Sequence, residues 1–228
     1  MIVILRGHIR NSFNDLQLYN FIKYLTQKYV LDIYIHTWSI KQNNISWRII
    51  KNDFTEINTK YIEDYFKDLF KFVKKIIIED EITINLLGNL NGKILASKTS
   101  ILGWKRYIYG QYKMLEYINN LIENKNDFVL NTRFDLFTNS YVFPFDEIIF
   151  FINNNYKKSF TKNLFLRNGE YCGIDNIILG NISTNFLLFS YLNFNLDKII
   201  LDENQNLIHP EFIISRVNNK LFFMSDTK

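Results

Sequence analysis

Short apolar runs alternate with amphipathic stretches along this chain. Residues 2–5 and 31–36 are two such runs, and residues 128–131 form a third. Apolar runs of this length are typical of strands that are buried on both faces of a parallel sheet. Further strands are expected at residues 82–87, 148–152 and 177–179.

Helices are expected between these runs. The helix expected to end at about Lys28 has a core face with the spacing i, i+3, i+4 and i+7: Leu18, Phe21, Ile22 and Leu25. Ser12 and Asp15 precede it with the spacing of a capping box. Similar spacing predicts helices at residues 62–76, 104–122 and 183–193, and after Pro210, whereas residues 88–103 have no sustained period and are expected to form a surface loop.

The alternation of strands and helices predicts an α/β fold with a central, mostly parallel sheet flanked by helices. No repeat or linker interrupts the chain, so a single domain over residues 1–228 is expected. A hydrophobic content of 47% excludes global disorder. The net charge of +4 is mild, and the lysines of the chain are spread out along the sequence. This pattern does not favour a nucleic-acid binder.

Cysteine usage and apolar segment length bear on the compartment. The single cysteine, Cys172, has no partner for an internal disulfide, so a reducing compartment is expected. The apolar run at residues 2–5 is too short for a signal peptide or a membrane span, and no later segment reaches eighteen uncharged apolar residues. We therefore expect a cytoplasmic protein.

Three polar clusters follow three of the predicted strands: Arg6, Gly7 and Arg10; His36, Thr37 and Trp38; and Arg133 and Asp135. Ligands of open α/β sheets collect beyond the carboxyl ends of the strands, so these clusters are expected to meet in one cleft. Trp38 stands at a strand end and is a candidate sugar platform, although tryptophans are more often part of the core.

The first cluster has the chemistry of a phosphate site. Gly7 would let a ligand approach the backbone, and Arg6 and Arg10 have guanidinium groups that bind phosphate bidentately. The helix that follows adds backbone N–H groups that favour an anion. An ordinary loop with solvated arginines is the alternative interpretation.

The third cluster combines Arg133 with a carboxylate, Asp135. A carboxylate just beyond a buried strand is placed to hold Mg²⁺ or Mn²⁺ against a diphosphate. A local surface ion pair between the two residues is the alternative. If Asp135 binds the metal, Asp135→Ala should abolish activity and leave thermal stability nearly unchanged.

Two further acids are candidates for a general base toward an acceptor hydroxyl. Asp175 lies in a Gly-Ile-Asp-Asn segment, and Glu211 follows Pro210 at the start of the last predicted helix. A carboxylate in either place can deprotonate a hydroxyl. It can equally cap a helix or interact with the helix dipole, and this alternative stays open for both residues.

Five segments occur in an order that resembles a known group of proteins: ILRGHIRNSF, DIYIHTW, YGQYKMLEYI, DFVLNTRFDLF and GIDNIILG. Together they are similar to bacterial GT-A-like glycosyltransferases of capsule and lipopolysaccharide assembly. The resemblance covers roughly residues 2–180. This chain departs from the usual pattern by having His8 in place of a glutamine and Asn131 in place of an arginine.

The resemblance implies a GT-A-like fold and a nucleotide-sugar donor bound across the first strand end. It matches Gly7 and Arg10 to the first turn, His36, Thr37 and Trp38 to the second, Arg133 and Asp135 to the third, and Asp175 to the last. Arg133-x-Asp135 would stand where GT-A enzymes carry Asp-x-Asp. Because only one acid is present, Arg6, Arg10 and Arg133 are an alternative source of positive charge for the diphosphate.

The expected function is therefore glycosyl transfer from a nucleotide-sugar to a glycan or lipid-linked glycan of a bacterial surface polysaccharide. A nucleotidyl- or phosphoryl-group transferase and a noncatalytic nucleotide- or glycan-binding module are the alternatives. Peripheral contact with the inner membrane is a further hypothesis. Its candidate residues lie in one polar, basic stretch: Lys157, Lys158, Phe160, Lys162 and Phe165.

Overall fold

A computed structural model describes residues 1–44, 51–94, 99–138, 143–166, 176–204 and 210–223. Its centre is a six-stranded sheet in the order β5-β2-β1-β6-β8-β7. The strands are β1 (Ile2–Arg6), β2 (Asp32–Trp38), β5 (Val73–Glu79), β6 (Phe128–Arg133), β7 (Leu164–Phe165) and β8 (Ile177–Asn181). Strands β5, β2, β1 and β6 are parallel, and β8 pairs antiparallel with β6 and β7. The predicted mostly parallel α/β sheet is confirmed.

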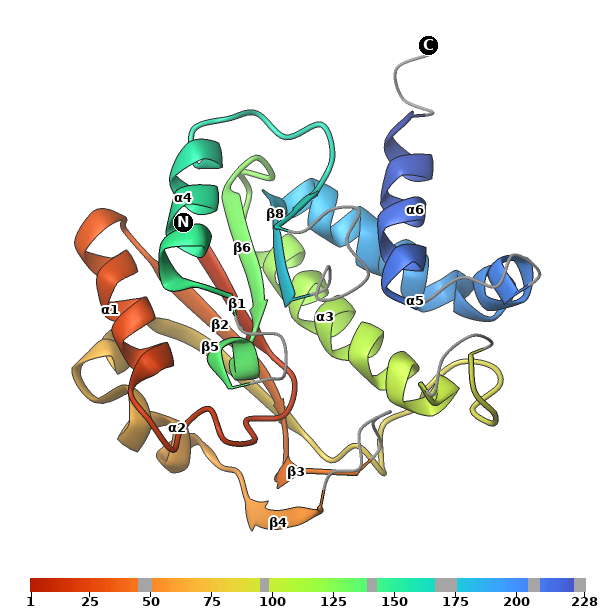
Figure 1. Cartoon of the computed structure of the whole chain (residues 1–228), viewed down its shortest axis with the longest axis horizontal. Helices are drawn as coiled ribbons and strands as arrows, with labels where there is room; N and C mark the ends of the chain where they lie inside the picture. The colour runs from red at the N-terminus through yellow and green to blue at the C-terminus, as the bar shows by residue number, and fades with distance from the viewer. Residues whose placement is uncertain (45–50, 95–98, 139–142, 167–175, 205–209, 224–228) are drawn as a thin grey trace.

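Helices cover both faces of this sheet (Figure 1). One face carries α1 (Gln17–Lys28), α2 (Thr59–Phe66), the 3-10 helices η1 (Lys67–Phe72) and η2 (Phe134–Phe137), and α4 (Phe145–Asn155). The other face carries α3 (Ile101–Leu121), α5 (Ile182–Asn204) and α6 (Pro210–Phe223). The side chains of strand β1 point alternately into the two cores: Val3 and Leu5 belong to the first, and Ile2 and Ile4 belong to the second. A continuous apolar run is buried here on both sides, as the sequence predicted.

A separate two-stranded ribbon follows β2. It consists of β3 (Ile40–Gln42) and β4 (Asp53–Glu56), which pair antiparallel. The polar composition of this region gave no sign of strands, because both lie outside the core and are partly or fully exposed. In Figure 1 the ribbon extends beyond the ends of β1 and β2.

Two predicted strands are wrong. Residues 148–152 belong to α4, where Pro144 precedes the helix and Asp146 and Glu147 occupy its first turn. A proline before the helix and acids in its first turn both favour an α-helix, and they outweigh the apolar run. Residues 82–87 form no strand, and β5, which ends at Glu79, is the edge strand of the parallel set.

The sequence predicts a helix over residues 62–76, but residues 73–76 belong to β5. The helix α2 ends at Phe66, and Lys67 then has a φ of 51°. This positive φ ends the α-helix, the 3-10 helix η1 follows, and the β-branched run at residues 76–78 lies in β5. The error matters for the site, because it hid the carboxyl end of a fourth parallel strand.

The starts of two helices also differ from prediction. Helix α1 begins at Gln17 without a capping box: Asp15 Oδ1 accepts a hydrogen bond from the Gln17 backbone N–H at 2.8 Å, and Ser12 is buried in the preceding loop. Helix α3 begins at Ile101, inside the expected loop, where the Ser100 hydroxyl accepts from the Gly103 N–H at 2.8 Å. Among the described helices, none combines the length and apolar character that crossing a bilayer requires.

Candidate functional site

The order of the parallel strands reverses between β1 and β6. From β1 the chain adds β2 and β5 on one side and later β6 on the other (Figure 1). Such a reversal opens a crevice beyond the carboxyl ends of the two strands, where doubly wound folds bind their ligands. The Cα of Arg6 pairs in register with both His36 and Arg133, so the three predicted clusters lie along one edge of the sheet.

Asp135 is the centre of the arrangement at the reversal. Arg133 donates from Nε to Oδ1 at 2.7 Å and from Nη2 to Oδ2 at 2.8 Å, and Arg10 donates from Nη1 to Oδ2 at 2.6 Å. The Asp135 side chain is 4% exposed, whereas those of Arg10 and Arg133 are 17% and 19% exposed. The prediction that Arg10 and Asp135 lie together is confirmed. Two partly exposed guanidinium groups, those of Arg10 and Arg133, bind one buried carboxylate.

The loop after β1 holds Arg10 in an uncommon conformation. Its φ is 52°, and its backbone N–H donates to the Lys41 carbonyl at 3.0 Å. A long side chain rarely adopts the left-handed region, and such residues persist where the surrounding structure over-determines them. Here the backbone bond to Lys41 and the side-chain bond to Asp135 fix both ends of Arg10.

Gly7 turns the chain from β1 into this loop. Its φ is 90°, its N–H donates to the His36 carbonyl at 3.1 Å, and its carbonyl accepts from the Thr37 hydroxyl at 3.0 Å. A Cβ added at Gly7 would meet no heavy atom of the described residues within 4 Å. The glycine is therefore required by the backbone conformation, and the described residues leave the space above it open.

Arg6 lies beneath this edge on the α3 side of the sheet. Its Nε donates to Asn131 Oδ1 at 2.7 Å, and Asn131 in turn donates to Gln111 Oε1 at 3.1 Å. The guanidinium carbon lies 4.9 Å from the centre of the Tyr107 ring. Arg6 is 3% exposed, so it adds positive charge below the site and does not present a surface to a ligand.

The second cluster, at the end of β2, is buried and does not face a ligand. His36, Thr37 and Trp38 are 1%, 0% and 3% exposed. The rings of His36 and Trp38 pack edge to face with centroids 5.1 Å apart. Trp38 therefore offers no open platform to a sugar in this arrangement, and the cluster positions the strand end.

Sequence reasoning missed Glu79, which holds His36. The Glu79 Oε2 lies 2.9 Å from His36 Nε2, and Oε1 accepts from the Tyr109 hydroxyl at 3.0 Å. Burial raises the pKa of Glu79, but the bonds from His36 and Tyr109 outweigh it and leave the pKa below its ordinary value. Helix α3 approaches closely at Gly110, where a Cβ would lie 2.7 Å from His36 ring atoms.

Glu81, the second missed acid, is 4% exposed. Its Oε2 lies 3.1 Å from Arg106 Nη1 and 3.6 Å from His8 Nε2, and Asn43 donates to Oε1. Burial raises the pKa of Glu81, but the neighbouring His8 and Arg106 together bring it below its ordinary value. Burial also lowers the pKa of His8, and Glu81 offsets only part of that effect. Both glutamates would have been candidates had the run before them been recognised as a strand.

No described contact joins either of the two predicted general bases to this cluster. Asp175 lies outside the described residues. Glu211 lies in the first turn of α6, which packs on α5, and a carboxylate there interacts favourably with the helix dipole. Catalytic roles for Asp175 and Glu211 stay predictions.

A divalent cation at Asp135 would compete with hydrogen bonds that are already in place. A carboxylate offers about four lone-pair positions, and three hydrogen bonds from Arg10 and Arg133 already occupy the oxygens of Asp135. Within the described ranges, no group of three or more His, Cys, Asp or Glu side chains is placed to hold a metal ion. The predicted Mg²⁺ or Mn²⁺ at Asp135 therefore gains no support from the donor set.

No protein-family model matches the sequence, and no curated protein is significantly similar to it. The functional argument therefore depends on the residues of the site. Two partly exposed guanidinium groups on a buried carboxylate, beside an open glycine turn, have the chemistry to bind a phosphate or diphosphate group.

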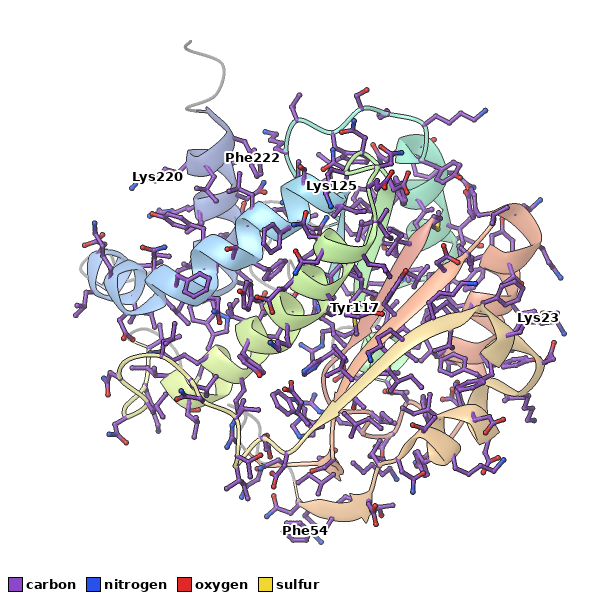
Figure 2. The ribbon with its side chains drawn as sticks, turned by 180° about the vertical axis from the view of Figure 1, so that it is seen from behind. Lys23, Phe54, Tyr117, Lys125, Lys220 and Phe222 are labelled. Atoms are coloured by element: carbon purple, nitrogen blue, oxygen red, sulfur yellow. The ribbon has the colours of Figure 1, made fainter. Side chains whose placement is uncertain are left out.

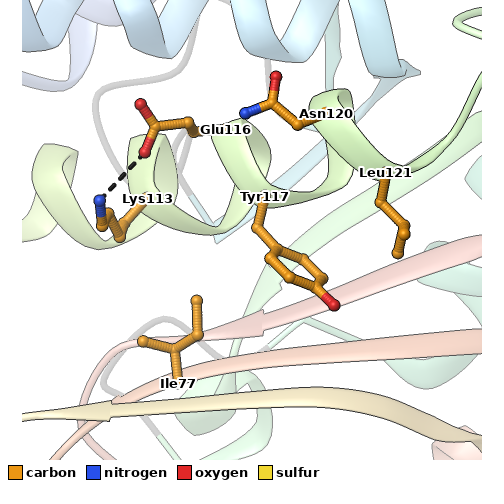
Figure 3. Close-up of a pocket in the computed structure, with 6 residues that line it drawn as sticks. All are labelled: Ile77, Lys113, Glu116, Tyr117, Asn120 and Leu121. Atoms are coloured by element: carbon orange, nitrogen blue, oxygen red, sulfur yellow. Dashed lines mark hydrogen bonds and ion pairs between the residues drawn. The ribbon is translucent and has the colours of Figure 1, made fainter.

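A pocket of about 370 Å³ lies elsewhere, between β5 and α3 (Figure 3). Tyr117 projects from α3 toward the sheet (Figure 2), and Lys113 and Glu116, which also line the pocket, form an ion pair at 3.1 Å (Figure 3). Tyr109 contacts the strand end at Glu79, and Tyr117 lies eight residues farther along the same helix, about 12 Å away. The Tyr117 end of the pocket therefore lies about two helical turns from the strand end, whereas Ile77 and Lys113 of its lining are nearer to Glu79.

Proposed function

We propose that this chain is a GT-A-like glycosyltransferase that uses a nucleotide-sugar donor. The observation that carries the proposal is the pairing of Arg10 and Arg133 on Asp135 at the strand-order reversal. This is the place where doubly wound sheets bind nucleotides. The order of the five sequence segments, which resembles the glycosyltransferases named above, supports the sugar-transfer chemistry.

In this proposal the donor diphosphate lies over the Gly7 turn and contacts Arg10 and Arg133. Negative charge grows on the diphosphate as the bond to the sugar breaks, and preorganised guanidinium groups stabilise it. Arg6 adds a fixed positive charge below. The acceptor is a glycan or lipid-linked glycan whose hydroxyl is deprotonated by a carboxylate, with Asp175 and Glu211 as the candidates.

The proposed setting is the cytoplasmic side of the inner membrane, in surface polysaccharide assembly. The aromatic residues first considered for membrane contact do not support it. Phe165 is 5% exposed, and the rings of Phe160 and Phe128 pack with centroids 5.6 Å apart. Any contact with lipid would therefore depend on the basic residues of that segment alone.

Thermal-shift screening against UDP-, GDP-, CMP- and dTDP-sugars tests the donor. A ligand that binds only the folded form raises the melting temperature by mass action. Product analysis with the best donor then separates the candidate reactions. Release of a nucleoside diphosphate, or of CMP from a CMP-sugar, with transfer of the sugar, supports the proposal. Release of pyrophosphate, or transfer of a phosphoryl group, would instead identify a nucleotidyl- or phosphoryl-group transferase.

A further inference from the structure

We infer that Arg10 and Arg133 balance the charge of the diphosphate without a divalent cation, and that Asp135 is a positioning residue for these two guanidinium groups. The inference rests on the proposed function, because it concerns the same diphosphate. It differs from the role expected for the acid from the family resemblance, which is to hold the metal.

The first argument is the hydrogen-bond geometry of Asp135. Arg133 spans both carboxylate oxygens at 2.7 and 2.8 Å, and Arg10 shares Oδ2 at 2.6 Å. A cation that entered the coordination sphere of Asp135 would have to replace these charge-assisted bonds. It would also stand beside two guanidinium groups that repel it.

The second argument is that the other described carboxylates at this edge are held in the same way. Glu79 contacts His36 and Tyr109, and Glu81 contacts Arg106 and Asn43. Metal sites for Mg²⁺ or Mn²⁺ commonly use one or two carboxylates together with phosphate oxygens and water. In the described part of the chain, each acid of this edge instead serves a cation or a hydrogen-bond donor.

The third argument is the placement of the two arginines. Because both donate to Oδ2, their guanidinium groups lie side by side, as neighbouring phosphoryl groups of a diphosphate require. Both remain partly exposed, although the carboxylate between them is buried. Arg10 is also held in a left-handed conformation, which is found more often at functional sites than elsewhere.

Nucleotide binding with and without divalent cation tests the inference. The probe is whichever of UDP, GDP, CDP and dTDP gives the largest thermal shift, and its Kd is measured by calorimetry in excess EDTA and in MgCl₂ or MnCl₂. We expect the Kd values in the two buffers to agree within about threefold, because the two guanidinium groups and not a cation balance the charge of the diphosphate. A cation that contributed to binding would change Kd by tenfold or more, which corresponds to about 1.4 kcal/mol.

Arginine variants test which groups supply the charge. Arg10→Lys and Arg133→Lys keep the charge but lose the planar bidentate donors, so we expect each to raise Kd about tenfold or more in EDTA. Arg216→Lys on α6 is the matched control, because Arg216 lies on an exposed part of that helix. Asp135→Asn should raise Kd by the same factor in EDTA and in metal, because it disturbs the arginines and removes no metal ligand.

The outcomes separate the two proposals. Binding that needs Mg²⁺ or Mn²⁺, with a Kd at least tenfold weaker in EDTA, overturns the inference and leaves the proposed function in place. An Asp135→Asn variant that loses only metal-dependent binding overturns it as well. If none of the four nucleotides binds in either buffer, the proposed function fails, and the inference fails with it. The Kd values of the wild-type protein in EDTA and in metal decide between metal-free and metal-dependent binding even if a variant does not fold.

Discussion

Replacement of Asp135 by alanine should destabilise the fold substantially. The side chain is 4% exposed and accepts three hydrogen bonds from two guanidinium groups. Removing one partner of a buried ion pair costs about 3–5 kcal/mol. Arg10 and Arg133 are 17% and 19% exposed and can recover part of their hydration, so we expect a loss of about 2–4 kcal/mol for Asp135→Ala.

Urea unfolding and calorimetry measure this loss. In a chain of this size 1 kcal/mol shifts Tm by about 2–4 °C, which predicts a decrease of roughly 5–15 °C. Asp64→Ala is the control, because the Asp64 side chain is 62% exposed and pairs with Lys60 on the surface of α2. A cycle of Asp135→Ala and Arg10→Ala should show a coupling of about 1 kcal/mol or more. An Asp135→Ala protein with the wild-type Tm would refute the buried pairing.

Three further predictions concern the stability of the protein and residues at the same edge of the sheet. Gly110→Ala places a Cβ 2.7 Å from His36 and should lower the free energy of unfolding by about 1–3 kcal/mol; a more stable variant in urea would contradict this close approach. Gly7→Ala meets no atom within 4 Å but requires a left-handed alanine, so a loss of about 1–2 kcal/mol is expected from the backbone alone, and an unchanged unfolding midpoint would disprove the positive φ. Because burial lowers the pKa of His8 below 6.5, the unfolded state binds more protons, and stability should fall as pH drops through that value. His8→Gln should flatten that slope in unfolding measurements at several pH values, and an equally steep slope would exclude His8 as its source.

The layer architecture could be predicted because it follows from local apolar patterns. The run at residues 2–5 is buried on both faces of the sheet, and the face of α1 that carries Leu18, Phe21, Ile22 and Leu25 is buried as predicted. The two main errors had different sources: the apolar run at residues 148–152 has no distinctive period, whereas the helical spacing at residues 62–76 continues past the end of α2 into β5. Spacing and apolar character alone do not decide whether such runs form a helix or a strand. Their flanking residues and tertiary contacts do.

The site could be predicted in position but only partly in roles. The strand-end rule correctly brought Arg10, Arg133 and Asp135 to one place. Burial is not visible in the sequence, so Asp135 was expected to tolerate alanine without loss of stability. The structure changes that expectation, because it shows the acid enclosed by two arginines. Glu79 and Glu81 were missed because β5, which ends at Glu79, was not recognised as a strand.

Hydrogen–deuterium exchange with a bound nucleoside diphosphate tests most directly whether the strand-order reversal is the nucleotide site. The account predicts slower exchange at residues 7–12 and 134–138, beside Arg10 and Asp135, with little change near Tyr117 in the pocket between β5 and α3. Protection confined to that pocket, or to the ribbon of β3 and β4, would contradict the account and place nucleotide binding on another surface.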